Sequence, residues 1–198
     1  YAKSITTGEG GMLLFSDQSL YKKAKAWHDH GHENNPKFPR WRDTRSGSGF
    51  NFRMNELQGA VGVAQLKKLD FIISKQRELA KKIFKMLETI DGIEVRTEPK
   101  NAISTYEAVV FMVKDEDAAN KIRETLLEKG IGTKILPEAT SWHFAGLWEH
   151  INDKNMFRES KACNEAQRLL KRSVSIPINI YPDGDVVEKV RSAILDSK

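Results

Sequence analysis

The longest regular pattern in this sequence runs from residue 55 to about residue 89. Apolar residues recur there at steps of three and four positions: Leu57, Val61, Ala64, Leu66, Leu69, Ile72, Ile73, Leu79, Ile83, Phe84 and Leu87. This spacing predicts an α-helix with one apolar face, as one long helix or as two joined end to end, and Asp91-Gly92 ends it. Helices of this length often connect domains or line an oligomer interface.

The residues after Gly92 alternate between strand and helix patterns. Strands are predicted at IEVRT, TYEAVVFMV, IGTKIL and SVSIPI, and helices at DEDAANKIRETLLEKG, NMFRESKACNEAQRLLKR and DGDVVEKVRSAILDSK. Together these elements predict a mixed α/β module over residues 91–198, which is a normal size for a domain.

The residues before the long helix contain too little strand to form a sheet. Residues 12–15 are the only predicted strand, and we expect it to be short and buried. Ser16 or Asp17 then caps a helix through SLYKKAKAWHDH, and a long loop covers residues 32–49. Because a four-residue strand needs neighbours, we expect residues 1–90 to be the end of a larger domain.

Composition and charge exclude several classes of protein. The 198 residues are 39% hydrophobic and 30% charged, which is usual for a globular protein, and no apolar run can cross a bilayer. The first residues do not resemble a signal peptide, and the single cysteine, Cys163, permits no internal disulfide, so we expect a cytoplasmic protein. The net charge of +5 raises the alternative of nucleic-acid binding. However, basic residues alternate with acids in KKLDFIISKQRELAKK, which is typical of solvated helix faces.

Lys3 is followed, after Ser4, by a glycine-rich turn, ITTGEGG. A lysine amine becomes a nucleophile toward carbonyl groups when its pKa is lowered, and such lysines bind pyridoxal phosphate (PLP) covalently. The glycines that follow allow the backbone to pass close to a bound group. On its own, this pattern also fits an ordinary surface loop.

Two stretches, KSITTGEGGMLLFSD and GFNFRMNELQGAVGVAQLKKLD, resemble the motifs of the DegT/DnrJ/EryC1/StrS family of PLP-dependent sugar aminotransferases. Gly59 stands where the family usually has alanine, which costs a helix about 1 kcal/mol. The resemblance implies the PLP-dependent transferase fold type I, like that of aspartate aminotransferase. Residues 1–90 would be the end of the PLP-binding large domain, and residues 91–198 the small α/β domain at the C-terminus.

The same resemblance implies that the first part of the large domain is missing from this sequence. In the family, that part supplies the phosphate cradle, the aromatic ring stacked on the cofactor, the acid at the pyridine nitrogen and a serine just before the lysine. We therefore expect the chain to be the C-terminal half of an enzyme, and not a competent transaminase by itself.

The resemblance also implies cofactor roles for three residues. Lys3 is the expected catalytic and PLP-binding lysine, and it would move the proton between substrate and cofactor. Asn51 is expected to reach the cofactor phosphate of the partner subunit in a homodimer. Arg53 is expected to add positive charge there or to bind a substrate carboxylate. The alternative for Asn51 and Arg53 is an ordinary loop at the start of the next helix, which has an N-terminal cap. Glu9 lies in the turn beside the lysine, where a purely structural role is an alternative.

Candidate substrate-binding residues fall in the loop of residues 32–49 and in ATSWHFAGLWEH: Arg40, Arg42, Arg45, Trp142 and His143. Guanidinium groups pair well with the carboxylate of an acidic sugar. These stretches resemble the branch of the family that forms 8-amino-3,8-dideoxy-manno-octulosonate (Kdo8N). The resemblance implies that L-glutamate aminates an 8-oxo-3-deoxy-octulosonate for lipopolysaccharide, with another nucleotide-linked sugar as the alternative substrate. The alternative for the residues is a basic surface loop and a core aromatic patch.

Three other interpretations stay open at this point. His28, His30 and His32 occupy alternate positions, and three imidazoles on one face can bind zinc. However, this stretch ends a helix, and histidine is also favoured at helix C-termini. We therefore predict no metal site. Relatives that use PLP for sugar dehydration have histidine in place of the lysine, so Lys3 argues against that reaction. The last alternative is a non-catalytic relative that acts as a regulator or interaction partner.

Overall fold

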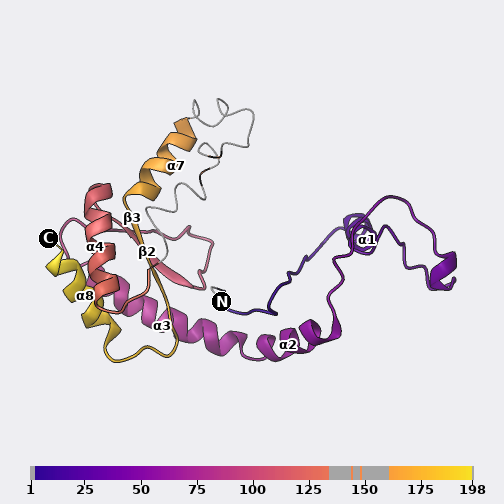
Figure 1. Ribbon diagram of the computed structural model, residues 1–198, viewed down its shortest axis with the longest axis horizontal. Helices are drawn as coiled ribbons and strands as arrows, with labels where there is room; N and C mark the ends of the chain where they lie inside the picture. Colours follow the sequence, from indigo (N-terminus) through magenta and orange to yellow (C-terminus); the bar gives the residue numbers. More distant parts are fainter. Residues whose placement is uncertain (1–2, 134–143, 145–147, 149–160, 198) are drawn as a thin grey trace. The chain divides into compact units, whose positions relative to one another are not determined.

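Figure 1 shows a computed structural model of the chain, which describes residues 3–133, 144, 148 and 161–197. The chain forms two compact units, Lys3–Leu69 and Asp70–Lys198. The boundary predicted after residue 90, between the large and the small domain, differs from this division into compact units, and it stays a prediction. In the part of the chain that the structure describes, no helix is long and apolar enough to span a membrane.

The second unit is built on a three-stranded antiparallel sheet. Its strands are β1 (Glu94–Val95), β2 (Ala108–Met112) and β3 (Ser173–Pro177), in the order β1-β2-β3. In β2, Val109 and Phe111 are fully buried while the residues beside them are partly exposed. This alternation is expected of a strand with one face in the core.

The helices described in this unit are α3 (Leu69–Leu87), α4 (Glu116–Glu128), α7 (Lys161–Lys171) and α8 (Val186–Asp196). α3, α4 and α8 share one hydrophobic core with β2 and β3 (Figure 1). The core residues with no exposed surface are Ala80, Ile83, Leu87, Val109, Phe111, Ala119, Leu126, Val174, Val190, Ala193 and Ile194. Burial of these apolar side chains is the main stabilising contribution in this unit.

α4 begins at an aspartate cap, Asp115. The side chain of Asp115 accepts a hydrogen bond from the backbone N–H of Ala118 at 2.9 Å. This bond satisfies one of the N–H groups that a helix N-terminus leaves without a partner. Gly130, which follows the C-cap residue Lys129, has a φ of +75°, which glycine adopts without strain.

We expect Asp115→Ala to lower the free energy of unfolding by about 1 kcal/mol, because the cap is lost. Asp115→Asn is the matched control, since asparagine caps helices about as well as aspartate. Urea denaturation of both variants measures the difference. Equal losses in the two variants would show that the charge of Asp115, and not its cap, stabilises the helix.

The first unit contains α1 (Gln18–Trp27), the short 3-10 helix η1 (Arg40–Arg42) and α2 (Glu56–Leu66). Of the two predicted caps of α1, the structure uses Asp17, whose carboxylate accepts from the backbone N–H of Leu20 at 2.8 Å. The described residues of this unit form no multi-residue β-strand.

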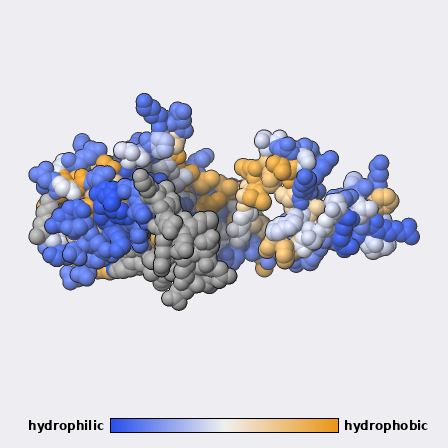
Figure 2. Space-filling model, turned by 90° about the horizontal axis from the view of Figure 1, so that it is seen from above, coloured by the Kyte–Doolittle hydropathy of each residue, from blue (hydrophilic) through white to orange (hydrophobic). Residues whose placement is uncertain are grey.

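The prediction of a short buried strand at residues 12–15 is wrong. The structure gives these residues no regular secondary structure, and Met12, Leu13 and Leu14 are 73%, 76% and 88% exposed. Figure 2 shows hydrophobic side chains at the surface. A strand needs a neighbour for its backbone hydrogen bonds, and the described residues of this unit supply none.

The long periodic segment forms α2 and α3 in succession, which is one of the two predicted arrangements. The strand predicted at IGTKIL is absent from residues 131–133, and its remainder lies outside the described residues. The beginning of the helix predicted at NMFRESKACNEAQRLLKR also lies outside them, and its end is α7.

Candidate functional site

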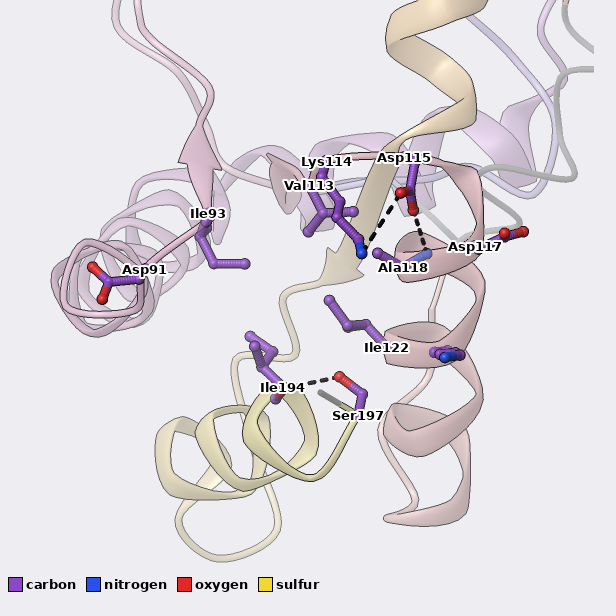
Figure 3. Close-up of a pocket in the computed structure, with 12 residues that line it drawn as sticks. Asp91, Ile93, Val113, Lys114, Asp115, Asp117, Ala118, Ile122, Ile194 and Ser197 are labelled. Atoms are coloured by element: carbon purple, nitrogen blue, oxygen red, sulfur yellow. Dashed lines mark hydrogen bonds and ion pairs between the residues drawn. The ribbon is translucent and has the colours of Figure 1, made fainter.

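A hollow of about 450 Å³ in the second unit holds none of the predicted site residues. Figure 3 shows its apolar side, with Ile122 of α4 facing Ile194 of α8. At the rim, Lys114 forms an ion pair with Asp115 at 3.8 Å. Neither the apolar side nor this ion pair suggests a binding site for PLP, so we look for the candidate site elsewhere.

A larger hollow, of about 940 Å³, lies in the first unit. It is lined by residues of the glycine turn, by α1 and by the segment that precedes α2. Asn51 and Arg53, which are predicted to bind the cofactor, are among its lining residues. We therefore treat this hollow as the candidate functional site.

The glycine turn after Lys3 is held by its own side chains and by α2. Thr6 Oγ1 accepts from the backbone N–H of Gly8 at 3.0 Å, and Thr7 Oγ1 donates to the carbonyl of Glu9 at 2.8 Å. A Cβ atom at Gly10, whose φ is +153°, would lie only 2.6 Å from Thr7 Oγ1. Glycine is therefore required at this position for both space and conformation.

The same turn is tied to the start of α2 through Gln58. Its side-chain amide donates to the carbonyl of Glu9 at 2.9 Å, while its backbone N–H donates to Asn55 Oδ1 at 2.9 Å. The backbone N–H of Asn55 in turn donates to Gln58 Oε1 at 3.1 Å, which completes a capping box. Asn55 thus caps α2, and Asn51 and Arg53 lie in the loop before this capped helix, so the alternative of a helix-start loop stays open.

Two glycine-containing segments cross closely beside the site. The backbone N–H of Phe50 donates to the carbonyl of Trp27 at 2.8 Å, and that of His30 donates to the carbonyl of Phe50 at 3.0 Å. A Cβ atom at Gly49 would lie 2.3 Å from the Trp27 carbonyl oxygen, and one at Gly31 would lie 2.1 Å from a backbone oxygen. Only glycine permits this crossing, which brings the residues before α2 against the end of α1.

Asn51 and Arg53 contact each other and a buried carboxylate. Arg53 Nε donates to Asn51 Oδ1 at 3.0 Å and lies 3.4 Å from Asp29 Oδ1. Asp29 is only 4% exposed, and Arg40 pairs with both of its oxygens, at 2.6 and 2.9 Å. The Arg40 guanidinium holds the pKa of the Asp29 carboxyl well below its usual range, so Asp29 is ionised at neutral pH.

The three predicted substrate-binding arginines have different environments. Arg40 is committed to Asp29, and Arg45 Nη2 lies 2.8 Å from His32 Nε2. In the part of the chain that the structure describes, Arg42 is exposed and has no side-chain partner. Trp41, beside it, is 85% exposed. Arg42 is therefore the arginine that remains open to a ligand.

Trp142 and His143, the other predicted substrate-binding residues, lie outside the described residues, so their roles stay predictions.

Asp43 organises the loop that carries these arginines. Its two carboxylate oxygens accept from the backbone N–H groups of Asn34 and Asn35, at 2.8 and 3.1 Å. These backbone hydrogen bonds, together with His32, lower the pKa of Asp43 below its usual value. Because a guanidinium only donates, His32 Nε2 accepts from Arg45, which places the imidazole proton on Nδ1, 3.3 Å from Asp43.

The described residues do not support the zinc alternative. No group of three or more histidine, cysteine, aspartate or glutamate side chains among them is placed to hold a metal ion. His28 Nδ1 instead lies 2.5 Å from the carbonyl of Lys25 at the end of α1, and His32 lies between Arg45 and Asp43.

Comparison with known proteins identifies the family. Residues 1–195 match the model of the DegT/DnrJ/EryC1/StrS aminotransferase family. The chain belongs to this family. GDP-perosamine synthase of Escherichia coli O157:H7 is 32% identical over 132 residues, which cover 67% of this chain and 34% of the relative. The UDP-4-amino-4,6-dideoxy-N-acetyl-beta-L-altrosamine transaminase of Helicobacter pylori is 26% identical over 196 residues, which cover 98% of this chain and 49% of the relative.

Solved structures of family members have the same fold. The Helicobacter pylori aminotransferase PseC, involved in the biosynthesis of pseudoaminic acid, gives a TM-score of 0.76 at 23% identity, covering 98% of this chain and 50% of that one. A GDP-4-keto-6-deoxy-D-mannose-3-dehydratase of E. coli, solved with hydrated PLP, gives 0.73 at 21% identity over 98% of this chain and 52% of that one. The predicted fold type I of PLP-dependent transferases is therefore confirmed, and the chain spans about half the length of these relatives.

The family's cofactor is PLP, and the residues of the first unit fit its phosphate. Since the carbonyl oxygen of Asn51 accepts from Arg53, its amide N–H groups are left as donors at the hollow. The guanidinium of Arg53 supplies positive charge beside them. This donor set suits an anion such as a phosphate ester.

Several residues of the site were not predicted from the sequence. The capping box of Asn55 and Gln58 follows a recognisable N-x-x-Q pattern before an apolar run, so the sequence contained a signal for it. Asp29 and Asp43 had no such signal, because their partners lie 5 to 24 positions away in a loop without periodicity.

Proposed function

We propose that the whole protein is a PLP-dependent aminotransferase that takes an amino group from L-glutamate and passes it to a keto- or aldehydo-sugar. The observation that carries this proposal is the contact of Arg53 with Asn51, which leaves amide and guanidinium donors at the hollow of the first unit. The family match over residues 1–195 supports it.

Each of the three predicted cofactor residues has a definite task in this proposal, although Lys3 is not among the residues that line the hollow. Lys3 binds the cofactor through its amine and moves a proton at the substrate carbon. Asn51 and Arg53 hold the phosphate of the cofactor that the partner subunit binds, so the enzyme is a homodimer with shared sites. PLP, when bound, supplies the electron sink for the reaction. Residues 1–90 complete the large domain and residues 91–198 form the small one.

For the sugar, we propose an 8-oxo-3-deoxy-octulosonate that is aminated in the cytoplasm on the way to lipopolysaccharide. Arg42 pairs with the sugar carboxylate, and the exposed ring of Trp41 offers an apolar face to the sugar. The second candidate is a nucleotide-linked sugar, which the names of the perosamine and altrosamine relatives favour. In both cases the acidic group of the substrate meets the same guanidinium.

Arg42→Gln in the whole protein is expected to raise KM for the acidic sugar about tenfold and to change kcat little, because one exposed charged contact is lost. Lys22→Gln, an equal change of charge on an exposed position of α1, is the control. Steady-state kinetics with varied sugar measures both. An unchanged KM for Arg42→Gln would remove this residue from the substrate site.

The proposal is tested by incubating the whole protein with PLP, L-glutamate and either candidate sugar. Formation of 2-oxoglutarate in step with an amino-sugar is the expected result, and the better sugar identifies the substrate. Cofactor binding without any amino transfer to a panel of keto- and aldehydo-sugars would instead favour the non-catalytic alternative.

A further inference from the structure

We infer that Asp29 is a positioning residue that fixes Asn51 and Arg53 in the orientation in which they meet the phosphate of the cofactor. The inference rests on the proposed function and goes beyond it, because Asp29 has no part in the sequence motifs that suggest that function.

Asp29 is built into the first unit as a buried anion. It is 4% exposed, and its carboxylate receives two hydrogen bonds from Arg40 and a third, at 3.2 Å, from Asn34 Nδ2. Charge-assisted and bidentate bonds of this kind are the strongest that a carboxylate makes in proteins. The Asp29 carboxylate is therefore held in place by two residues of the loop 32–49, Arg40 and Asn34.

From this fixed position, Asp29 acts on Arg53. Arg53 Nε donates to Asn51 Oδ1 at 3.0 Å and forms an ion pair with Asp29 Oδ1 at 3.4 Å, so the same guanidinium contacts both residues. Because Nε can only donate, the carbonyl end of the Asn51 amide must face Arg53 and the NH₂ end must face away. Asp29 thus determines, through Arg53, which end of Asn51 meets an anion.

The backbone joins the same residues. Asp29 and Asn51 form an antiparallel bridge, flanked by hydrogen bonds from His30 N–H to Phe50 at 3.0 Å and from Phe52 N–H to His28 at 2.9 Å. A shift at Asp29 is therefore transmitted to Asn51 by main chain as well as by side chains. Two independent connections support the positioning role.

Asp29→Asn keeps the size of the side chain and removes its charge. An amide in this place offers one oxygen to two guanidinium groups and turns an NH₂ donor toward one of them. Arg53 then loses a charged partner and can rotate, which frees the Asn51 amide to turn its oxygen toward the phosphate. We expect weaker binding of the phosphate, whereas Lys3 keeps its reaction with the aldehyde.

The test compares the affinity of the whole protein for PLP and for pyridoxal, which has the same aldehyde but no phosphate. The dissociation constant for pyridoxal divided by that for PLP, both measured by absorbance titration, isolates the contribution of the phosphate. Asp29→Asn is expected to reduce this ratio at least tenfold. Asp43→Asn is the matched control, since the carboxylate of Asp43 in the neighbouring loop also has little exposed surface and contacts neither phosphate-directed residue. Its ratio is expected to stay at the wild-type value.

An unchanged ratio in Asp29→Asn would overturn the inference, because a merely structural role lowers the affinity for PLP and for pyridoxal alike. Equal decreases of the ratio in Asp29→Asn and Asp43→Asn would also overturn it, because the effect would then not be specific to Asp29. If Asp29→Asn does not fold, Asp29→Glu decides, since it keeps the charge but displaces it; a wild-type ratio there overturns the inference. A wild-type protein that binds neither compound at Lys3 contradicts the proposed function itself. A wild-type preference for PLP that Asp29→Asn retains contradicts only the role of Asp29.

Discussion

Lys3→Arg in the whole protein is expected to lower the rate of transamination by at least about 10²–10⁴-fold, the contribution of a positioned proton-transfer group. Arginine keeps the positive charge, but it stays protonated at neutral pH and neither attacks a carbonyl nor takes up a proton. The loss should therefore appear in kcat, and saturating L-glutamate should not restore it. Single-turnover measurements with L-glutamate separate this step from product release.

The control for this experiment is Lys22→Arg, the same substitution on an exposed position of α1. It should leave the rate at the wild-type value. Residual activity of Lys3→Arg above about one tenth of wild type would mean that another residue moves the proton, and the assignment of Lys3 would fail.

Phe111→Ala is expected to lower the free energy of unfolding of the second unit by about 3–5 kcal/mol. Phe111 has no exposed surface and belongs to β2 at the centre of the three-stranded sheet. Alanine removes a whole ring from a core shared by three helices, and the surrounding side chains close the cavity only in part. Urea denaturation of the chain measures the loss.

Val110→Ala is the matched control, because Val110 is the next residue of β2, points to the opposite face of the sheet and is only partly buried. We expect it to cost less than about 1.5 kcal/mol. Similar losses for the two variants would show that the sheet has two equally buried faces, contrary to the burial pattern of β2.

The second unit could be predicted well because its signals are local. The apolar run TYEAVVFMV predicts the strand observed as β2, although only the structure shows which of its faces is buried. Asp115 is both a sequence signal and the observed cap of α4. The break between α2 and α3 was left open, since apolar residues continue through it at helical spacing and only two residues, Lys67 and Lys68, separate the helices.

The first unit could be predicted less well, since its contacts join residues far apart in sequence. Residues 12–15 have the composition of a buried strand, yet the described residues give them no partner strand. Arg40 and Arg45 were equivalent to Arg42 in the sequence, and only the positions of Asp29 and His32 distinguish them. Charge pairing across a loop leaves no periodic trace, so geometry was needed to find it.

The measurement that tests the central claim most directly is to add PLP to the whole protein, reduce with borohydride, digest it and determine the mass of the peptide that contains Lys3. The account predicts a pyridoxyl group attached to Lys3. A Lys3 peptide without that group, in a protein that is folded and has bound the cofactor, would contradict the transaminase mechanism and would favour a binding or regulatory protein with the same fold.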